Sequence, residues 1–101
     1  MGFSEDMIQQ VWEKGTRVAN YNPDKWRKDC CGAWINRGQY GNRDNKVGYG
    51  WEIDHISPRA NDGPDCLSNL RPLHWYNNVH KSDGRVSTAV TAEGDHNVCK
   101  L

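Results

Sequence analysis

Four side chains in the second half of the sequence could together carry out hydrolysis. Asp54 and His55 are adjacent, and Lys81 follows three residues after Asn78. The imidazole has an unperturbed pKa of about 6.5, so His55 can accept a proton from water near neutral pH. The oxygens of Asp54 and Asn78 are hard ligands of the kind that Mg²⁺ prefers. A base and two such oxygens are the residue types that metal-assisted hydrolysis uses.

Several of these positions also have a purely structural interpretation. Asp54 could pair with Arg71 or Arg59 instead of holding a metal ion. Asn77 is adjacent to Asn78 and stays open as the ligand, although the Asn-x-x-Lys spacing favours Asn78 because residues three apart share a helix face.

The elements that must position these residues follow one another closely along the chain. Residues 51–54 alternate apolar and acidic, which predicts a strand with Trp51 and Ile53 facing inward. Successive strand residues face opposite sides, so this strand must end or bend at His55 if His55 is to act together with Asp54. The expected elements after it are a turn-rich loop at 57–66, a second short strand near 71–74 and a short helix at 75–81.

The secondary structure outside residues 51–81 is predicted in less detail. A helix is expected over 4–18, with a serine at its start as cap and apolar residues on one face. Residues 21–29 are expected to form a loop, and 31–35 either a strand or a packed turn. The glycine-rich stretch 37–50 predicts a long loop. For 85–101 an edge strand and a tail are both open.

Composition fits a small folded domain with a thin core. The chain has 101 residues, and ten of them are Trp, Tyr or Phe. Aromatic side chains bury large areas, so a few of them can anchor a small core. The longest apolar run, 30–35, is far shorter than the ~20 residues that a membrane helix needs. The first residues lack the basic region of a signal peptide, so we expect an intracellular protein without a membrane partner.

The formal net charge is zero, but the charges are segregated along the chain. Residues 14–47 hold eight Lys and Arg against three Asp, whereas residues 48–70 hold four acids against one Arg. A basic segment beside an acidic one suits a surface that binds a polyanion next to a divalent-metal site. A solvated surface that happens to segregate its charges is the alternative.

The four cysteines do not form a zinc motif. Cys30, Cys31, Cys66 and Cys99 include no C-x-x-C pair, whereas zinc ribbons need two. A makeshift site from Cys30, Cys66 and His74 is conceivable, but a structural zinc is not expected. In an intracellular protein disulfides are not expected either.

The stretch EIDHISPRANDGPDCLSNLRPLHWYNNVHKSDG resembles the HNH endonucleases, also called His-Me finger nucleases. The family pattern runs E-I-D-H-I-x-P, a glycine-containing loop, N-L-x-P-L and N-x-x-K. Here Asn69 is the middle Asn and Asn78 stands at the final position, which makes the chain an HNN variant of the zinc-free phage and bacterial type. The resemblance implies an α+β fold, with a small ββα-metal core, an added N-terminal helix and long loops. It also implies one nuclease domain over 1–101 with its core motif at 51–83.

The resemblance further implies a metal-dependent endonuclease that hydrolyses DNA in a bacterial or phage-infected cytoplasm. His55 would be the general base, and Asn69 would support it by bracing a turn. Asp54 and Asn78 would hold Mg²⁺ or Mn²⁺, which stabilises the leaving 3′ oxygen. A nucleic-acid-binding module that has lost catalysis is the alternative. The oligomeric state, a homodimer included, is open.

Six cations are candidates for contacts with DNA phosphates. Lys81 and Arg59 belong to the motif, and the basic segment contributes Arg27, Lys28, Arg37 and Arg43. Side chains on such polar sequence can reach phosphates and would give contacts independent of base sequence. For Lys81, a role as an ordinary solvated lysine is equally open.

Overall fold

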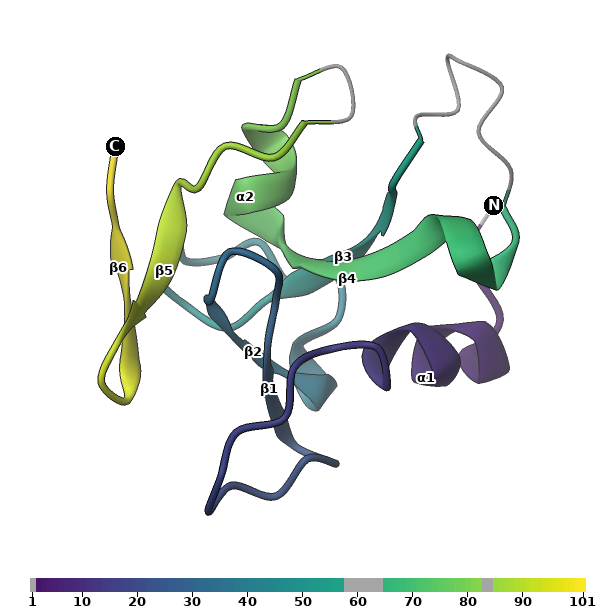
Figure 1. Cartoon of the computed structure of the whole chain (residues 1–101), viewed down its shortest axis with the longest axis horizontal. Coiled ribbons are helices and arrows are strands. Elements are labelled where there is room, and N and C mark those ends of the chain that lie inside the picture. The colour runs from purple at the N-terminus through teal and green to yellow at the C-terminus, as the bar shows by residue number, and fades with distance from the viewer. Residues whose placement is uncertain (1, 58–64, 83–84) are drawn as a thin grey trace.

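The computed structural model describes residues 2–57, 65–82 and 85–101, which form three antiparallel strand pairs and two α-helices (Figure 1). The expected α+β class is confirmed. None of the helices in these ranges is long and apolar enough to cross a membrane. In chain order the elements are α1 (Glu5–Trp12), β1 (Trp26–Lys28), β2 (Trp34–Asn36), a 3-10 turn (Arg37–Gln39), β3 (Trp51–His55), a 3-10 turn (Leu67–Asn69), β4 (Leu70–His74), α2 (Trp75–Val79), β5 (Val90–Glu93) and β6 (His96–Cys99).

Helix α1 covers the hydrophobic core at the base of the β3–β4 pair. Its cap is the hydroxyl of Ser4, which accepts a hydrogen bond of 3.1 Å from the backbone N–H of Met7. Acidic residues in its first turn favour the helix because they oppose the dipole. Its buried face packs against aromatic and aliphatic side chains from β2, β3 and β4. The core consists of Ile8, Val11, Trp12, Ile35, Trp51, Ile53 and Leu70.

Strands β3 and β4 place Asp54 opposite Arg71 and His55 opposite Leu70. Trp51 and Ile53 are buried, as their alternation in the sequence predicted. Strand β4 passes into α2 without a loop, and the His74 ring caps the helix by accepting from the N–H of Tyr76 at 3.1 Å. This strand–strand–helix order fixes the relative positions of the motif residues.

The prediction of a loop throughout 21–29 is wrong for its last part. Strand β1 lies there, since Lys28 exchanges backbone hydrogen bonds with Thr16 as well as pairing with β2. Arg27 in its centre is buried, and its guanidinium donates to the carbonyls of Pro23, Glu13 and Gly15. A three-residue strand is too short to leave a periodic pattern, so sequence reasoning missed it.

A buried carboxylate, Asp29, joins the β1–β2 turn to the start of α2. Its Oδ1 accepts from the backbone N–H of Cys31 and Ala33, at 2.9 and 2.8 Å. Its Oδ2 accepts from the backbone N–H of His74 at 2.9 Å and from the Asn77 amide at 3.1 Å. Four N–H donors therefore compensate the burial of this charge.

Asn77 extends the same network to the C-terminal hairpin. Its side-chain oxygen accepts from the backbone N–H of Ala89 and Val90, at 2.8 and 2.7 Å, and its amide donates to the Val90 carbonyl. The segment 85–101, which the sequence left open, contains the hairpin β5–β6 (Figure 1). Asn97 on β6 holds this hairpin to β2 through the backbone N–H and carbonyl of Trp34.

Asn77→Ala is expected to lower the free energy of unfolding by about 3 kcal/mol or more. It leaves several buried N–H and C=O groups without partners, and each such group costs about 1–3 kcal/mol. Urea unfolding measures the loss. The matched control is Asn78→Ala, since Asn78 is only half-buried, and its cost should be about 1 kcal/mol or less. Equal losses in the two variants would contradict a structural role specific to Asn77.

Candidate active site

Asp54 is the centre of the charged cluster between β3, β4 and α2. Its side chain is only 2% exposed, and both carboxylate oxygens are engaged. The Nε of Arg71 donates to Oδ2 at 2.7 Å, and the ammonium of Lys81 donates to Oδ1 and to the backbone carbonyl of His55. The pairing of Asp54 with Arg71, which the sequence analysis left as an alternative, is thus present. Lys81 adds a second cation to the same carboxylate.

Asn78 is held by Glu52, a residue that sequence reasoning missed. The Asn78 amide donates to Oε1 of Glu52 at 2.8 Å. A carboxylate can only accept, so the amide nitrogen must face it and the carboxamide oxygen must point elsewhere. Glu52 lies two residues before Asp54 on β3, so both acids stand on one face of the strand. The acidic alternation in WEID was the signal that could have identified it.

Arg43 anchors Glu52 from the long loop. Its guanidinium forms a two-pronged ion pair with the Glu52 carboxylate and lies 5.9 Å from the ring centre of Trp75. Burial raises the pKa of Glu52, but the hydrogen bonds from Arg43 and Asn78 outweigh burial and the net pKa is lowered. Glu52 is therefore ionised at neutral pH and keeps Asn78 in place.

His55, the last residue of β3, has different neighbours from Asp54. Its Nε2 lies 2.5 Å from Oδ1 of Asp65, and its ring packs against Phe3 with the centroids 6.2 Å apart. Because the carboxylate can only accept, Nε2 carries the proton, and in the neutral imidazole Nδ1 is left as the proton acceptor. The structure does not bring the His55 ring into contact with the Asp54 carboxylate. The two residues are linked instead through the ammonium of Lys81.

Asn69 braces the chain directly after His55. Its side-chain oxygen accepts from the N–H of Ser57 at 2.8 Å, and its amide donates to the Ser57 carbonyl at 3.1 Å. Its own carbonyl accepts from the N–H of Ile56. These three bonds extend the β3–β4 pairing past the end of the strands and hold the backbone that leaves His55.

The cations proposed to contact DNA phosphates have other partners in this structure. Arg37 donates to the side chain of Gln9 at 2.9 Å and lies over the Trp51 ring. Arg43 is paired with Glu52, and Lys81 with Asp54. Arg59 lies outside the described residues.

Two of the open alternatives can now be resolved from hydrogen bonding. Both ends of the Asn77 side chain are bound within the protein and the residue is fully buried, so Asn78 is the better-placed oxygen donor. His74 is fully buried, with Nδ1 accepting from Tyr76 and Nε2 donating to the Gly48 carbonyl at 2.8 Å. With both nitrogens occupied, His74 cannot join Cys30 and Cys66 in a zinc site.

Residues 39–84 match the model of the HNH endonuclease family. The matched segment, just under half of the chain, is similar to the HNH endonucleases. The HNH match spans β3, β4 and α2, and it includes Asp54, His55 and Asn78. No curated protein and no solved structure gave a significant match to the chain.

The HNH match suggests nuclease activity on nucleic acid, and HNH nucleases generally use a divalent metal. Within the described part of the chain, no group of three or more His, Cys, Asp or Glu side chains is arranged to hold a metal ion. An ion bound among the described residues would take neutral protein oxygens, water or substrate oxygens as further ligands.

The stability of the protein is expected to fall as the pH is lowered below about 6.5, partly through His74. Burial lowers the pKa of His74 below its ordinary value. Below about pH 6.5, His74 is therefore protonated more readily in the unfolded chain than in the folded protein. The uptake of one proton on unfolding lowers the free energy of unfolding by at most about 1.4 kcal/mol for each pH unit.

Urea unfolding at pH 7.5 and 5.5 measures this effect. His74→Asn keeps a helix-capping side chain that does not titrate, so its loss of stability between the two pH values should be smaller than that of the wild type. An equal loss in both proteins would assign the pH dependence to other groups.

Proposed function

We propose that this protein is a metal-dependent endonuclease that hydrolyses phosphodiester bonds in DNA. The observation that carries the proposal is the placement of Asp54 and Asn78 on neighbouring elements, with Glu52 bonded to Asn78 from the same face of β3 as Asp54. Two hard oxygen donors and a general-base candidate at the end of β3 match the chemistry that the HNH family carries out.

The residues fit a divalent ion in their donor chemistry. Asp54 supplies a carboxylate, and the Asn78 carboxamide oxygen has no hydrogen bond from the described residues while its nitrogen is bound to Glu52. A metal ion on these two oxygens would neutralise the charge that develops on the leaving 3′ oxygen. Mg²⁺ commonly has only one or two protein ligands and keeps water and phosphate oxygens for the rest.

Lys81 must change partners for this chemistry. Its ammonium now donates to the Asp54 oxygen that would serve the ion. Once released, this flexible cation is positioned one helical turn beyond Asn78 and can contact a substrate phosphate. Arg71 can stay on the other Asp54 oxygen, so the carboxylate keeps its orientation throughout.

His55 would take the proton from the attacking water on Nδ1. Asp65 holds Nε2–H, which fixes the tautomer and stabilises the imidazolium that forms. Asn69 holds the backbone that follows, so that the ring is presented from a braced chain. Each of these contacts belongs to the protein itself and is in place before substrate binds.

Cleavage of supercoiled plasmid with Mg²⁺, Mn²⁺ or EDTA tests the proposed function. We expect cleavage with a divalent ion and none with EDTA. His55→Ala should reduce the rate by about 10²–10⁴-fold, the usual contribution of a general base, while DNA affinity changes less than about twofold. A wild-type protein that binds DNA but does not cut it with any ion would support the alternative of an inactive binding module.

Mn²⁺ binding without DNA separates the roles of Asn78 and Lys81. Asn78→Ala removes one oxygen donor and should weaken binding about tenfold. Lys81→Gln removes a competing positive charge beside Asp54 and should tighten binding about fivefold or more, since like charges a few Å apart repel strongly. Calorimetric titration measures both. If the three proteins bind Mn²⁺ equally, the ion is held elsewhere in the chain.

A further inference from the structure

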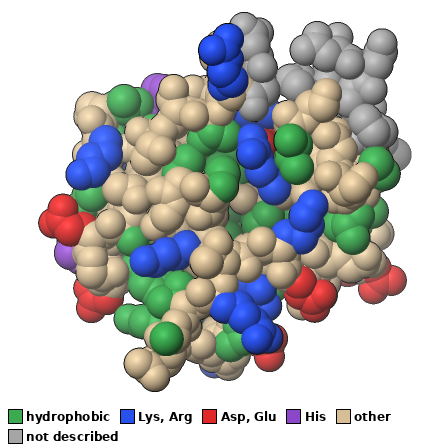
Figure 2. Space-filling view, viewed as in Figure 1, with side chains coloured by type: hydrophobic (Ala, Val, Ile, Leu, Met, Phe, Trp, Pro, Cys, Tyr) green, Lys and Arg blue, Asp and Glu red, His purple; other side chains and the backbone are tan. Residues whose placement is uncertain are grey.

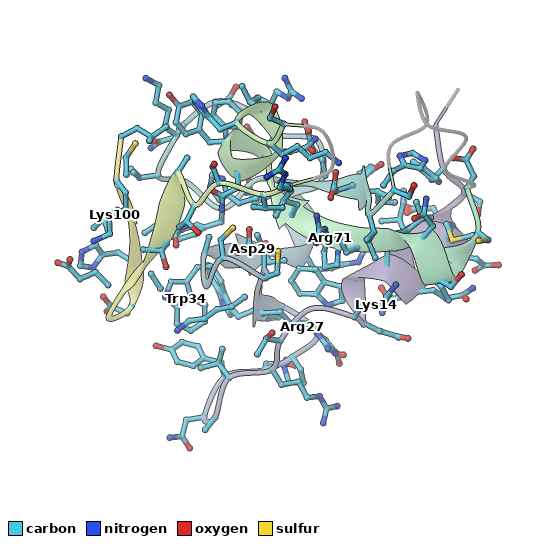
Figure 3. All side chains as sticks on the ribbon, turned by 45° about the horizontal axis from the view of Figure 1, so that its top comes forward. Lys14, Arg27, Asp29, Trp34, Arg71 and Lys100 are labelled. Atoms are coloured by element: carbon cyan, nitrogen blue, oxygen red, sulfur yellow. The ribbon has the colours of Figure 1, made fainter. Side chains whose placement is uncertain are left out.

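A small cavity opens between the end of α1, β1 and β4, away from the Asn78 side of Asp54. Its volume is about 80 Å³, which is enough for one small anion and too little for a nucleobase. In Figure 3, Lys14, Asp29 and Arg71 lie around this region, between α1 and β4. The residues of its lining that bear charge or reactive groups are Lys14, Thr16, Lys28, Asp29, Cys30 and Arg71.

The charge balance of this cavity favours an anion. Lys14, Lys28 and Arg71 contribute three positive charges. Asp29 is the opposing acid, and the four hydrogen bonds that its oxygens accept from N–H groups stabilise its charge without cancelling it. Lys14 donates to the backbone carbonyls of Leu67 and Leu70, and neutral carbonyls do not cancel its charge. The lining residues therefore carry three positive charges against one negative charge, and Arg71 shares its charge with Asp54 outside the lining.

Arg71 connects the cavity to the candidate active site. Its Nε is bound to Asp54, and Arg71 lines the cavity as well. A guanidinium presents five N–H donors in a fixed plane, and this arrangement matches phosphate oxygens. An anion bound to Arg71 in the cavity would thus share this guanidinium with the Asp54 carboxylate.

We propose that this cavity binds a backbone phosphate of the DNA strand, other than the phosphate that is cleaved. The inference rests on the proposed function, and it assigns DNA contacts to Lys14 and Lys28, whose present partners are two backbone carbonyls and the Trp34 ring, none of which carries a negative charge. Figure 2 shows Lys and Arg side chains spread over the visible face, with acidic side chains at the left edge and among the basic ones at the lower right.

Cys30 is a natural reporter of the cavity. It lines the cavity and is exposed. A hydrogen bond from the Cys31 thiol lowers the pKa of Cys30 to about 7, so a large share of Cys30 is reactive thiolate at neutral pH. A phosphate in the cavity would block the sulfur and disfavour the thiolate. Cys99 is exposed on β6 and is not among the residues that line the cavity, so it is an internal control.

The experiment measures alkylation of each cysteine in the full chain by iodoacetamide, with peptide mass spectrometry and with EDTA present to prevent cleavage. A duplex oligonucleotide should slow the alkylation of Cys30 at least fivefold and leave Cys99 unchanged. Millimolar inorganic phosphate should have a weaker effect. Protection by inorganic phosphate without protection by the duplex would overturn the DNA assignment, and so would no protection at all.

A double variant, Lys14→Gln with Lys28→Gln, tests whether protection arises in the cavity. In this variant the duplex should no longer protect Cys30, and it should bind at least fivefold more weakly. The slope of log K against log salt should become less negative by up to about two, since each phosphate contact contributes about 0.9. Lys100→Gln, a charge loss at the position labelled far from the cavity in Figure 3, should match the wild type. If the double variant keeps Cys30 protected, DNA merely covers the cavity and the proposal is wrong.

This test can fail independently of the proposed function. Cys30 protection is read without a divalent ion, whereas plasmid cleavage is read with one. A protein that cleaves plasmid while Cys30 stays reactive on the duplex would retain the nuclease function and lose only the phosphate site.

Discussion

The buried carboxylate of Asp29 is the constraint on which the rest of the structure depends. A chain of 101 residues buries a limited core, and small domains often need an additional staple. Here the staple is polar: Asp29 and Asn77 join the β1–β2 turn, the start of α2 and the β5–β6 hairpin through hydrogen bonds that leave neither side chain unsatisfied. Because a partly satisfied network of this kind is costly, it also specifies a single arrangement of these segments.

This network determines which face α2 presents to the candidate site. Asn77 is drawn inward to Asp29, so the next residue, Asn78, must project in a different direction and reaches Glu52 on β3. Two adjacent asparagines of the same chemistry thereby acquire different roles. His74, the last residue of β4, also fixes the orientation of α2. Its ring caps the helix, and the helix begins at the next residue, so no loop allows the helix to rotate relative to the strand.

The positive side chains fall into two groups with different physical tasks. Arg27 and Arg43 satisfy carbonyls or a carboxylate within the protein, so they stabilise the fold and the position of Asn78. Arg71 and Lys81 balance the charge of Asp54 in the candidate site. A basic sequence segment therefore overstates the number of cations that are available to DNA, because a guanidinium that is buried on backbone carbonyls cannot also reach a phosphate.

The sequence alone determined the order of strand, strand and helix around the motif, the inward faces of Trp51 and Ile53, and the HNH resemblance. Each of these depends on residues that are close together in the sequence, so the spacing of apolar and polar residues is enough to predict it. Only the tertiary structure decided that β1 lies inside an expected loop, that 85–101 contains a hairpin, and which partners Asp54 and Asn77 have. The reason is range: Asn77 binds Asp29 across 48 residues of sequence, and Lys81 reaches Asp54 across 27. Contacts between such distant positions leave no trace in local spacing, because they exist only once the core has brought the elements together.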